Sequence, residues 1–209
     1  MILETNPFGF RTNDVGPLWM GHRLITAKTA SAYRKLIYPK GGFVLHMLRQ
    51  LMFDAQKASD EPFIRMMHDF VNTHHNKDAS TESFKASVEK HMKPWMDLAG
   101  TGKMDWFFGQ WAYGTELPSY EFEYSLNAME GGQAHLKGRI SQEGVSDGFR
   151  MAVRVYVRLK DRLIRIGAGN MIGTDSPLDI DMQLPWMPES VEINSLYDVL
   201  AEKVTIKRQ

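Results

Sequence analysis

Histidine is the residue type from which a catalytic metal site or a general base is most often built. The sequence has seven: His22, His46, His68, His74, His75, His91 and His135. None belongs to an HExxH motif, and no two lie at the i, i+4 spacing that places two imidazoles on one face of a helix. We therefore interpret them as solvent-exposed or helix C-terminal residues, with opportunistic metal binding as the alternative.

Other catalytic patterns are also missing from the sequence. No GxSxG serine elbow occurs, and Gly167, Gly169 and Gly173 do not open a helix as a phosphate-binding loop requires. The absence of cysteine excludes disulfides, thiolate zinc sites and cysteine nucleophiles. We predict no metal or other cofactor bound by this chain alone.

An acidic cluster offers one further metal candidate. Asp175, Asp179 and Asp181 supply the oxygen ligands that calcium prefers. However, the two later aspartates alternate with Ile180 and Met182, and this alternation is typical of one solvent-facing side of a strand. We favour the strand interpretation.

Charge and hydropathy exclude two classes of partner. The 25 Lys+Arg balance 25 Asp+Glu, and neither sign forms a long block, so we expect no nucleic-acid footprint and no polybasic membrane anchor. The first residues lack a basic region followed by an apolar run, so no signal peptide is expected. No apolar stretch is long enough to span a bilayer. The sequence does not indicate a compartment.

Helical periodicity dominates the first half of the chain. After an irregular lead-in over residues 1–28, the pattern predicts helices over about 39–55, from Asp60, from Ser80 or Thr81, and over about 103–113. Proline suits a first helical turn, and Asp60 and Ser80 suit N-caps. The aromatic run within 106–113 is apolar on nearly all sides, so we expect it to be buried between the two halves of the chain, with ligand stacking as the alternative.

The period changes at Pro118. Alternating runs predict strands over 120–126, 134–141, 149–159, 163–168, 178–184 and 191–193, and Lys160-Asp161 is typical of a tight hairpin. About seven short strands separated by turns favour a β-sandwich. The predicted fold class is thus α+β, with a helical unit over 1–117 and a β-sandwich over 118–209.

Three segments carry a family resemblance. Residues 38–49 read YPKGGFVLHMLR, which resembles the Y-x-K-G-a-x-V-L-x-M-L-R segment of the M1-family (gluzincin) zinc aminopeptidases. Residues 79–84, ASTESF, are similar to that family's A-T-T-x-D-F helix start, and DWFFGQW at 105–111 is similar to its L-x-x-F-F-x-Q-W segment. The order and intervals also agree, and the resemblance is best over about 33–118.

The resemblance implies a fold and a reaction. Residues before about 117 would complete a thermolysin-like helical subdomain, and the remainder would be an immunoglobulin-like sandwich. The whole enzyme would remove N-terminal residues from peptides, using a zinc-activated water assisted by a glutamate base. By position, Tyr38 matches the family tyrosine whose phenol donates a hydrogen bond to the oxyanion of the tetrahedral intermediate.

Pro39 departs from the family pattern, in which this position is commonly acidic. Because a residue before proline is disfavoured in the helical region, we expect Tyr38 to have an extended backbone just before a helix and to project into a cleft. The alternative is that Tyr38 packs against the helices.

The chain lacks the rest of the family's catalytic set. HExxH with its later glutamate and the G-x-M-E-N segment are missing, and in the family both precede Y-x-K-G. We therefore expect a C-terminal fragment that is inactive alone, with zinc, peptide substrate and the remainder of the peptidase as its partners in the whole enzyme. The alternatives are a stand-alone adaptor that binds a protein partner and, by fold analogy only, a glycan-binding sandwich.

Overall fold

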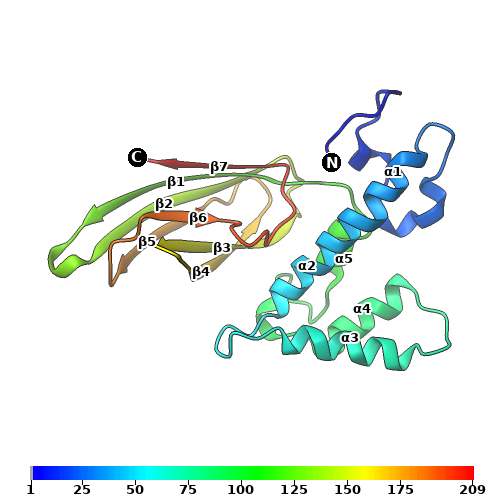
Figure 1. The fold of residues 1–209 in the computed structure, drawn as a ribbon, viewed down its shortest axis with the longest axis horizontal. Coiled ribbons are helices and arrows are strands. Elements are labelled where there is room, and N and C mark those ends of the chain that lie inside the picture. The colour runs from blue at the N-terminus through cyan, green and yellow to red at the C-terminus, as the bar shows by residue number, and fades with distance from the viewer. Residues whose placement is uncertain (1) are drawn as a thin grey trace. The chain divides into compact units, whose positions relative to one another are not determined.

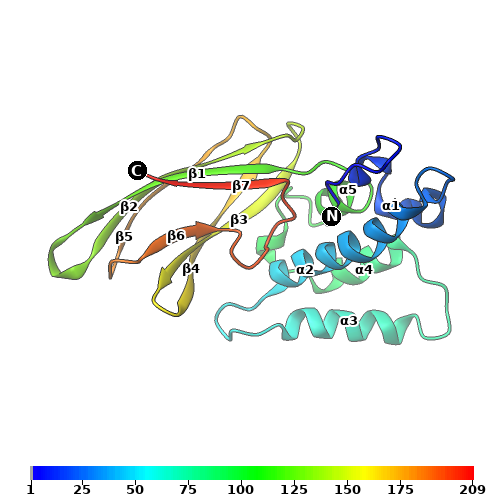
Figure 2. The same ribbon diagram turned by 45° about the horizontal axis from the view of Figure 1, so that its top comes forward.

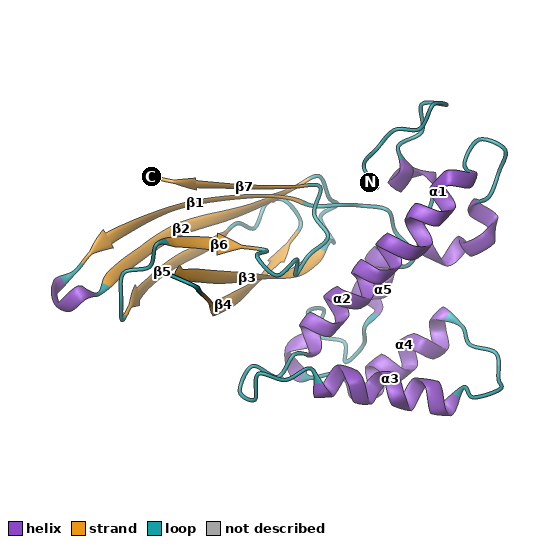
Figure 3. Ribbon diagram, viewed as in Figure 1, coloured by secondary structure: helices purple, strands orange, loops and turns teal. Residues whose placement is uncertain are grey.

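The change of hydrophobic period near Pro118 is the point at which helices give way to strands (Figure 3). The computed structural model describes residues 2–209, and in this range the fold is α+β. The chain divides into two compact units, the first ending at Thr115 and the second beginning at Glu116. No helix among the described residues is both long and apolar enough to cross a membrane.

The first unit is helical (Figure 1). Its lead-in forms two 3₁₀ segments, Thr12–Val15 and Leu18–Leu24. The elements that follow are α1 (Ala30–Lys35), a π-helical turn (Leu36–Lys40), α2 (Gly41–Met52), α3 (Glu61–Thr73), α4 (Thr81–His91), a 3₁₀ turn (Pro94–Met96) and α5 (Asp105–Trp111). The helix predicted from residue 39 therefore extends further back, because α1 and the π-turn run into α2 without a break.

The predicted starts of α3 and α4 are confirmed. Ser80 caps α4 by accepting a hydrogen bond from the Ser83 N–H, while the Ser83 hydroxyl accepts one from the Ser80 N–H. Asp60 stands at the N-cap of α3, but its carboxylate pairs with Arg49 of α2 instead of capping. That ion pair ties α2 to α3.

Aromatic side chains connect α3, α4 and α5 in the first unit, whose buried core also contains many leucines and methionines. Helices α3 and α4 run alongside each other (Figure 2), and Phe70 on α3 meets Phe84 on α4 edge to face at 5.0 Å. Phe84 also contacts Phe108 of α5. Trp106 is buried and donates its indole N–H to the Met96 carbonyl. Trp106, Phe107, Phe108 and Trp111 are thus buried as predicted, whereas Tyr113 is exposed, and the prediction that the run lies between the two halves of the chain stays a prediction.

The second unit consists of strands. Residues 119–208 form a four-stranded sheet in the order β5-β2-β1-β7 and a three-stranded sheet in the order β4-β3-β6. Their bounds are β1 (Ser119–Ala128), β2 (Ala134–Glu143), β3 (Arg150–Leu159), β4 (Arg162–Ile172), β5 (Leu178–Leu184), β6 (Ser190–Ile193) and β7 (Lys203–Arg208). Neighbouring strands are antiparallel, except that β7 runs parallel to β1.

Side chains of both sheets share the core of this unit. Phe122 and Tyr124 of β1 are buried and stacked at 5.2 Å, and the Tyr124 hydroxyl accepts a hydrogen bond from the Val191 N–H of β6. At Gly169 on β4, an added Cβ would overlap the side chain of Leu178 on β5. Gly169 therefore leaves the space that the Leu178 side chain occupies where the two sheets approach each other.

One turn and one strand of the second unit show where the sequence-based prediction succeeded and where it failed. The hairpin predicted at Lys160-Asp161 joins β3 to β4, with Lys160 at a positive φ of 48°. In contrast, β7 was not predicted. Only Val204 and Ile206 are apolar there, among charged residues of the kind that protect a sheet edge from further pairing.

Candidate functional site

Tyr38 lies in the π-helical turn between α1 and α2, and its side chain is 70% exposed. The Gly41 N–H donates to the Leu36 carbonyl, the i to i−5 bond that defines a wider turn than the α-helix. The prediction of an extended backbone at Tyr38 is therefore wrong. Inside a helix, the ring of Pro39 would clash with the carbonyl four residues earlier, and the wider turn relieves this clash without ending the helix.

Open space lies beside Tyr38, at the positions one helical turn later in the chain. Apart from the adjacent residues and the backbone of the helix itself, a Cβ added at Gly41 or Gly42 would meet no atom within 4 Å. Further along α2, Leu45 is 37% exposed and Arg49 is held by Asp60. No residue among 2–209 engages the Tyr38 hydroxyl in a hydrogen bond. The phenol is thus free to donate to a bound group, and at 70% exposure Tyr38 does not show the alternative arrangement, in which it packs against the helices.

Lys40, two residues after Tyr38, is buried and only 1% exposed. Its amine donates to the Asn13 side-chain oxygen at 2.8 Å. Burial lowers the pKa of Lys40 from its ordinary value of 10.5 to about 8, while the nearby Asp14 carboxylate acts in the opposite direction. The π-turn therefore exposes one polar side chain and buries another.

The histidines occupy separate places in the fold. His91 contacts Asp69 at 2.9 Å between α4 and α3, and His135 contacts Asp181 at 2.6 Å between β2 and β5. His22 contacts the hydroxyl of Tyr33. Over residues 2–209, no three His, Asp or Glu side chains come together in a way that could hold a metal ion. The described part of the chain therefore does not fit a zinc ion.

Of the three aspartates of the acidic cluster, Asp179 and Asp181 face solvent on β5, and Asp175 is exposed in the turn before this strand. Asp179 pairs with Arg139 and Asp181 pairs with His135, and each partner lowers the pKa of its aspartate. Ile180, between them, is only half-buried, and the alternation along β5 confirms the predicted strand face. Among residues 2–209 these aspartates join no group of three His, Asp or Glu side chains that could hold a metal ion, so the structure does not support a calcium site here.

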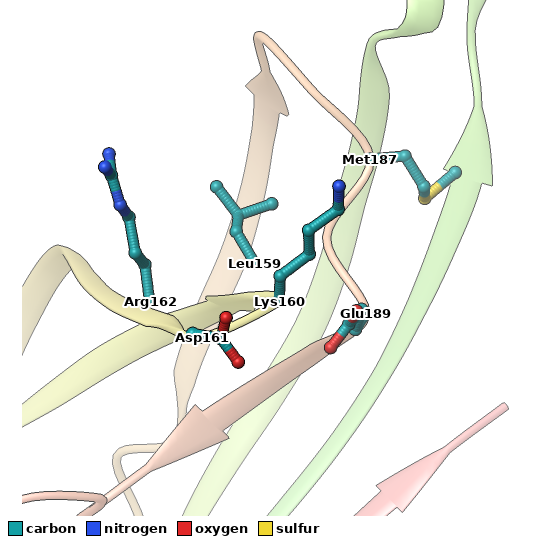
Figure 4. Close-up of a pocket in the computed structure, with 6 residues that line it drawn as sticks. All are labelled: Leu159, Lys160, Asp161, Arg162, Met187 and Glu189. Atoms are coloured by element: carbon teal, nitrogen blue, oxygen red, sulfur yellow. The ribbon is translucent and has the colours of Figure 1, made fainter.

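A shallow pocket of about 480 Å³ lies on the second unit (Figure 4). It is lined by Leu159, Lys160, Asp161, Arg162, Met187 and Glu189. The lining contains two cationic residues, Lys160 and Arg162, and two anionic residues, Asp161 and Glu189. All four are exposed. The pocket therefore has no buried polar group that would orient a ligand.

Sequence patterns did not reveal a buried ionic cluster in the second unit. The Asp198 carboxylate accepts from the Tyr156 hydroxyl at 2.7 Å and from Arg154 at 3.2 Å, and all three residues are buried. Burial lowers the pKa of Arg154 and raises that of Tyr156. Arg154 lies within the apolar run of β3. A charged residue at such a position was the sequence feature that could have indicated a buried ionic cluster. The cluster fixes the segment between β6 and β7 to β3.

Comparisons with known proteins give a fold but no family. No protein-family model matches the sequence, and no curated protein matches it significantly. Among solved structures, the chain is similar to the crystal structure of Legionella pneumophila aminopeptidase A in complex with aspartic acid, with a TM-score of 0.52 and 15% identity. The match covers 86% of this chain and 18% of that one. At this identity the likeness concerns the fold alone.

Proposed function

We propose that this chain is the C-terminal part of an M1-type zinc aminopeptidase and that it supplies Tyr38 as a hydrogen-bond donor to the oxyanion of the reaction. The ordered motifs over 38–49, 79–84 and 105–111 support this proposal. So does the likeness over 86% of the chain to a segment of an aminopeptidase. In this proposal the helical unit completes a thermolysin-like subdomain and the two sheets form an immunoglobulin-like sandwich.

The observation that carries the proposal is that the Tyr38 side chain is exposed and its hydroxyl is not used by the described residues. A phenol accelerates peptide hydrolysis when it donates to the oxygen on which negative charge develops, because that bond is stronger in the transition state than in the substrate. Such a donor must not be occupied by the protein itself. Tyr38 meets this requirement, since it is 70% exposed beside two glycines on a continuous helix.

The remaining catalytic parts belong to another segment in this proposal. Because the described residues offer no metal site, the zinc, the general base and the site for the substrate's amino terminus come from the remainder of the peptidase. The chain alone would neither retain stoichiometric zinc nor hydrolyse aminoacyl p-nitroanilides. One tightly held zinc per chain together with robust turnover would refute the proposal.

The alternative is an adaptor that binds a protein partner, and one feature favours it. The Asn6 side-chain oxygen accepts hydrogen bonds from the Phe8 and Phe10 N–H groups, and this fixed loop exposes both aromatic rings. The genomic sequence in frame before Met1 separates the two functions. An open frame encoding HExxH supports the peptidase, whereas an in-frame stop codon followed by a ribosome-binding site supports the adaptor.

A further inference from the structure

We propose that Lys40 and Asn13 form a positioning pair that fixes the direction in which the side chain of Tyr38 points away from the helix. This inference rests on the function proposed for Tyr38 and adds two residues to it. Neither side chain can contact a bound peptide directly, because Lys40 is 1% exposed and Asn13 is fully buried. Their effect on the reaction is exerted through the π-turn.

Asn13 is a fixed point in the first unit. Its side-chain amide donates to the Thr115 carbonyl, and its backbone N–H donates to the Ile2 carbonyl at 2.9 Å. With the Lys40 amine on its side-chain oxygen, both ends of the Asn13 amide are engaged. Lys40 therefore binds to a group that cannot rotate to follow it.

The π-turn needs such an anchor on its C-terminal side. On its N-terminal side, Leu36 is completely buried and holds the turn by packing. On the C-terminal side come Gly41 and Gly42, which have no side chains to pack and leave the backbone more freedom than other residues. Lys40 is thus the buried side chain between Tyr38 and the two glycines, and its contact with Asn13 determines where the turn lies.

The protonation of Lys40 gives the pair a measurable signature. Within residues 2–209, Asn13 is the only hydrogen-bond partner of the Lys40 amine, so a charged ammonium leaves two of its three donors unused. Asp14 is the charged group that acts on Lys40, and Asp14 itself pairs with Arg11. Loss of the proton converts the charge-assisted bond from Lys40 to Asn13 into a weaker neutral one, so the anchor weakens as the pH rises through about 8.

The test places a fluorine probe at the exposed position. With 4-trifluoromethylphenylalanine in place of Tyr38, the otherwise native chain should give one ¹⁹F line whose shift changes with a midpoint near pH 8. This probe has no ionisable hydroxyl, and because the α-amino group also titrates near pH 8, the change is assigned to Lys40 by its loss in Lys40→Met. A line that stays constant from pH 7 to 9.5 would overturn the inference, and this measurement requires no substitution at Lys40.

Variants then separate positioning from general stabilisation. Lys40→Met should shift or split the ¹⁹F line well below the melting temperature and abolish its pH dependence. Lys40→Gln keeps a neutral donor, so its line should lie closer to the native position and show no titration. Lys35→Met is the matched control, because Lys35 also ties the lead-in to this helix, through exposed Glu4, and its removal should leave the line unchanged.

A purely structural role would lower the melting temperature of Lys40→Met and leave the folded-state line at its native position, which would contradict the inference. The readout does not involve peptide hydrolysis. Failure of the proposed enzymatic function would therefore leave this result intact, and failure of the positioning pair would leave the role of the Tyr38 phenol to be decided by kinetics.

Discussion

The burial of Lys40 predicts that its own contribution to the stability of the chain increases as the pH rises above 8. Burial lowers the folded-state pKa of Lys40 to about 8, below the 10.5 of an exposed lysine. Between these two pH values the unfolded chain binds more protons than the folded chain, so the free energy of unfolding increases with pH. This contribution is fully present above pH 10.5 and is lost as the pH falls through 8.

The magnitude follows from the two pKa values. One pKa unit corresponds to about 1.36 kcal/mol, so the full effect is about 3 kcal/mol. About 2 kcal/mol of it falls between pH 7.5 and pH 10. Urea unfolding followed by tryptophan fluorescence can resolve a difference of this size.

Lys40→Met isolates the effect from other groups that titrate at alkaline pH. Methionine retains most of the apolar stem and removes the amine, so wild type should gain about 2 kcal/mol relative to the variant from pH 7.5 to 10. Lys35→Met serves as a control for a half-exposed lysine that is paired with Glu4 and precedes the π-helical turn. Parallel stability profiles for wild type and Lys40→Met would refute the assignment of a buried, readily deprotonated amine.

Three further substitutions test the packing, each by urea unfolding. Ser80→Ala should cost about 1 kcal/mol through loss of the α4 cap, while Ser80→Gly should cost only a few tenths. Gly169→Ala should cost about 1–3 kcal/mol, and Leu178→Ala should cost less in the Gly169→Ala background than in wild type because the overlap is then relieved. Asp198→Ala should cost about 3–5 kcal/mol, because it leaves the buried Arg154 without its carboxylate; a cost below 1 kcal/mol would show that water reaches this cluster.

Most elements were predictable because their signals are local. Ser80 and Pro118 each mark a boundary through the chemistry of one or two residues, and the alternation along β5 needs only its own sequence. The strand β7 escaped prediction because its charged residues mask a short apolar alternation. Its place in the sheet comes from pairing with β1, about 80 residues earlier in the chain.

The candidate site was predictable only in part. The motif around residues 38–49 identified Tyr38, but Pro39 suggested a break in the backbone where the structure has a widened helical turn. The contact between Lys40 and Asn13 spans 27 residues, and no local pattern indicates that a lysine is buried. Such pairs depend on tertiary packing and become visible only in the folded chain.

The central claim is that Tyr38 acts on the oxyanion of peptide hydrolysis, and steady-state kinetics test it most directly. The chain would be assayed together with the zinc-bearing remainder of the peptidase, with Tyr38→Phe compared with Tyr33→Phe, a tyrosine of α1 whose hydroxyl contacts His22. We predict that Tyr38→Phe lowers kcat about 100- to 1000-fold with KM and zinc content unchanged, and that Tyr33→Phe has little effect. A Tyr38→Phe enzyme with native kcat would contradict the claim.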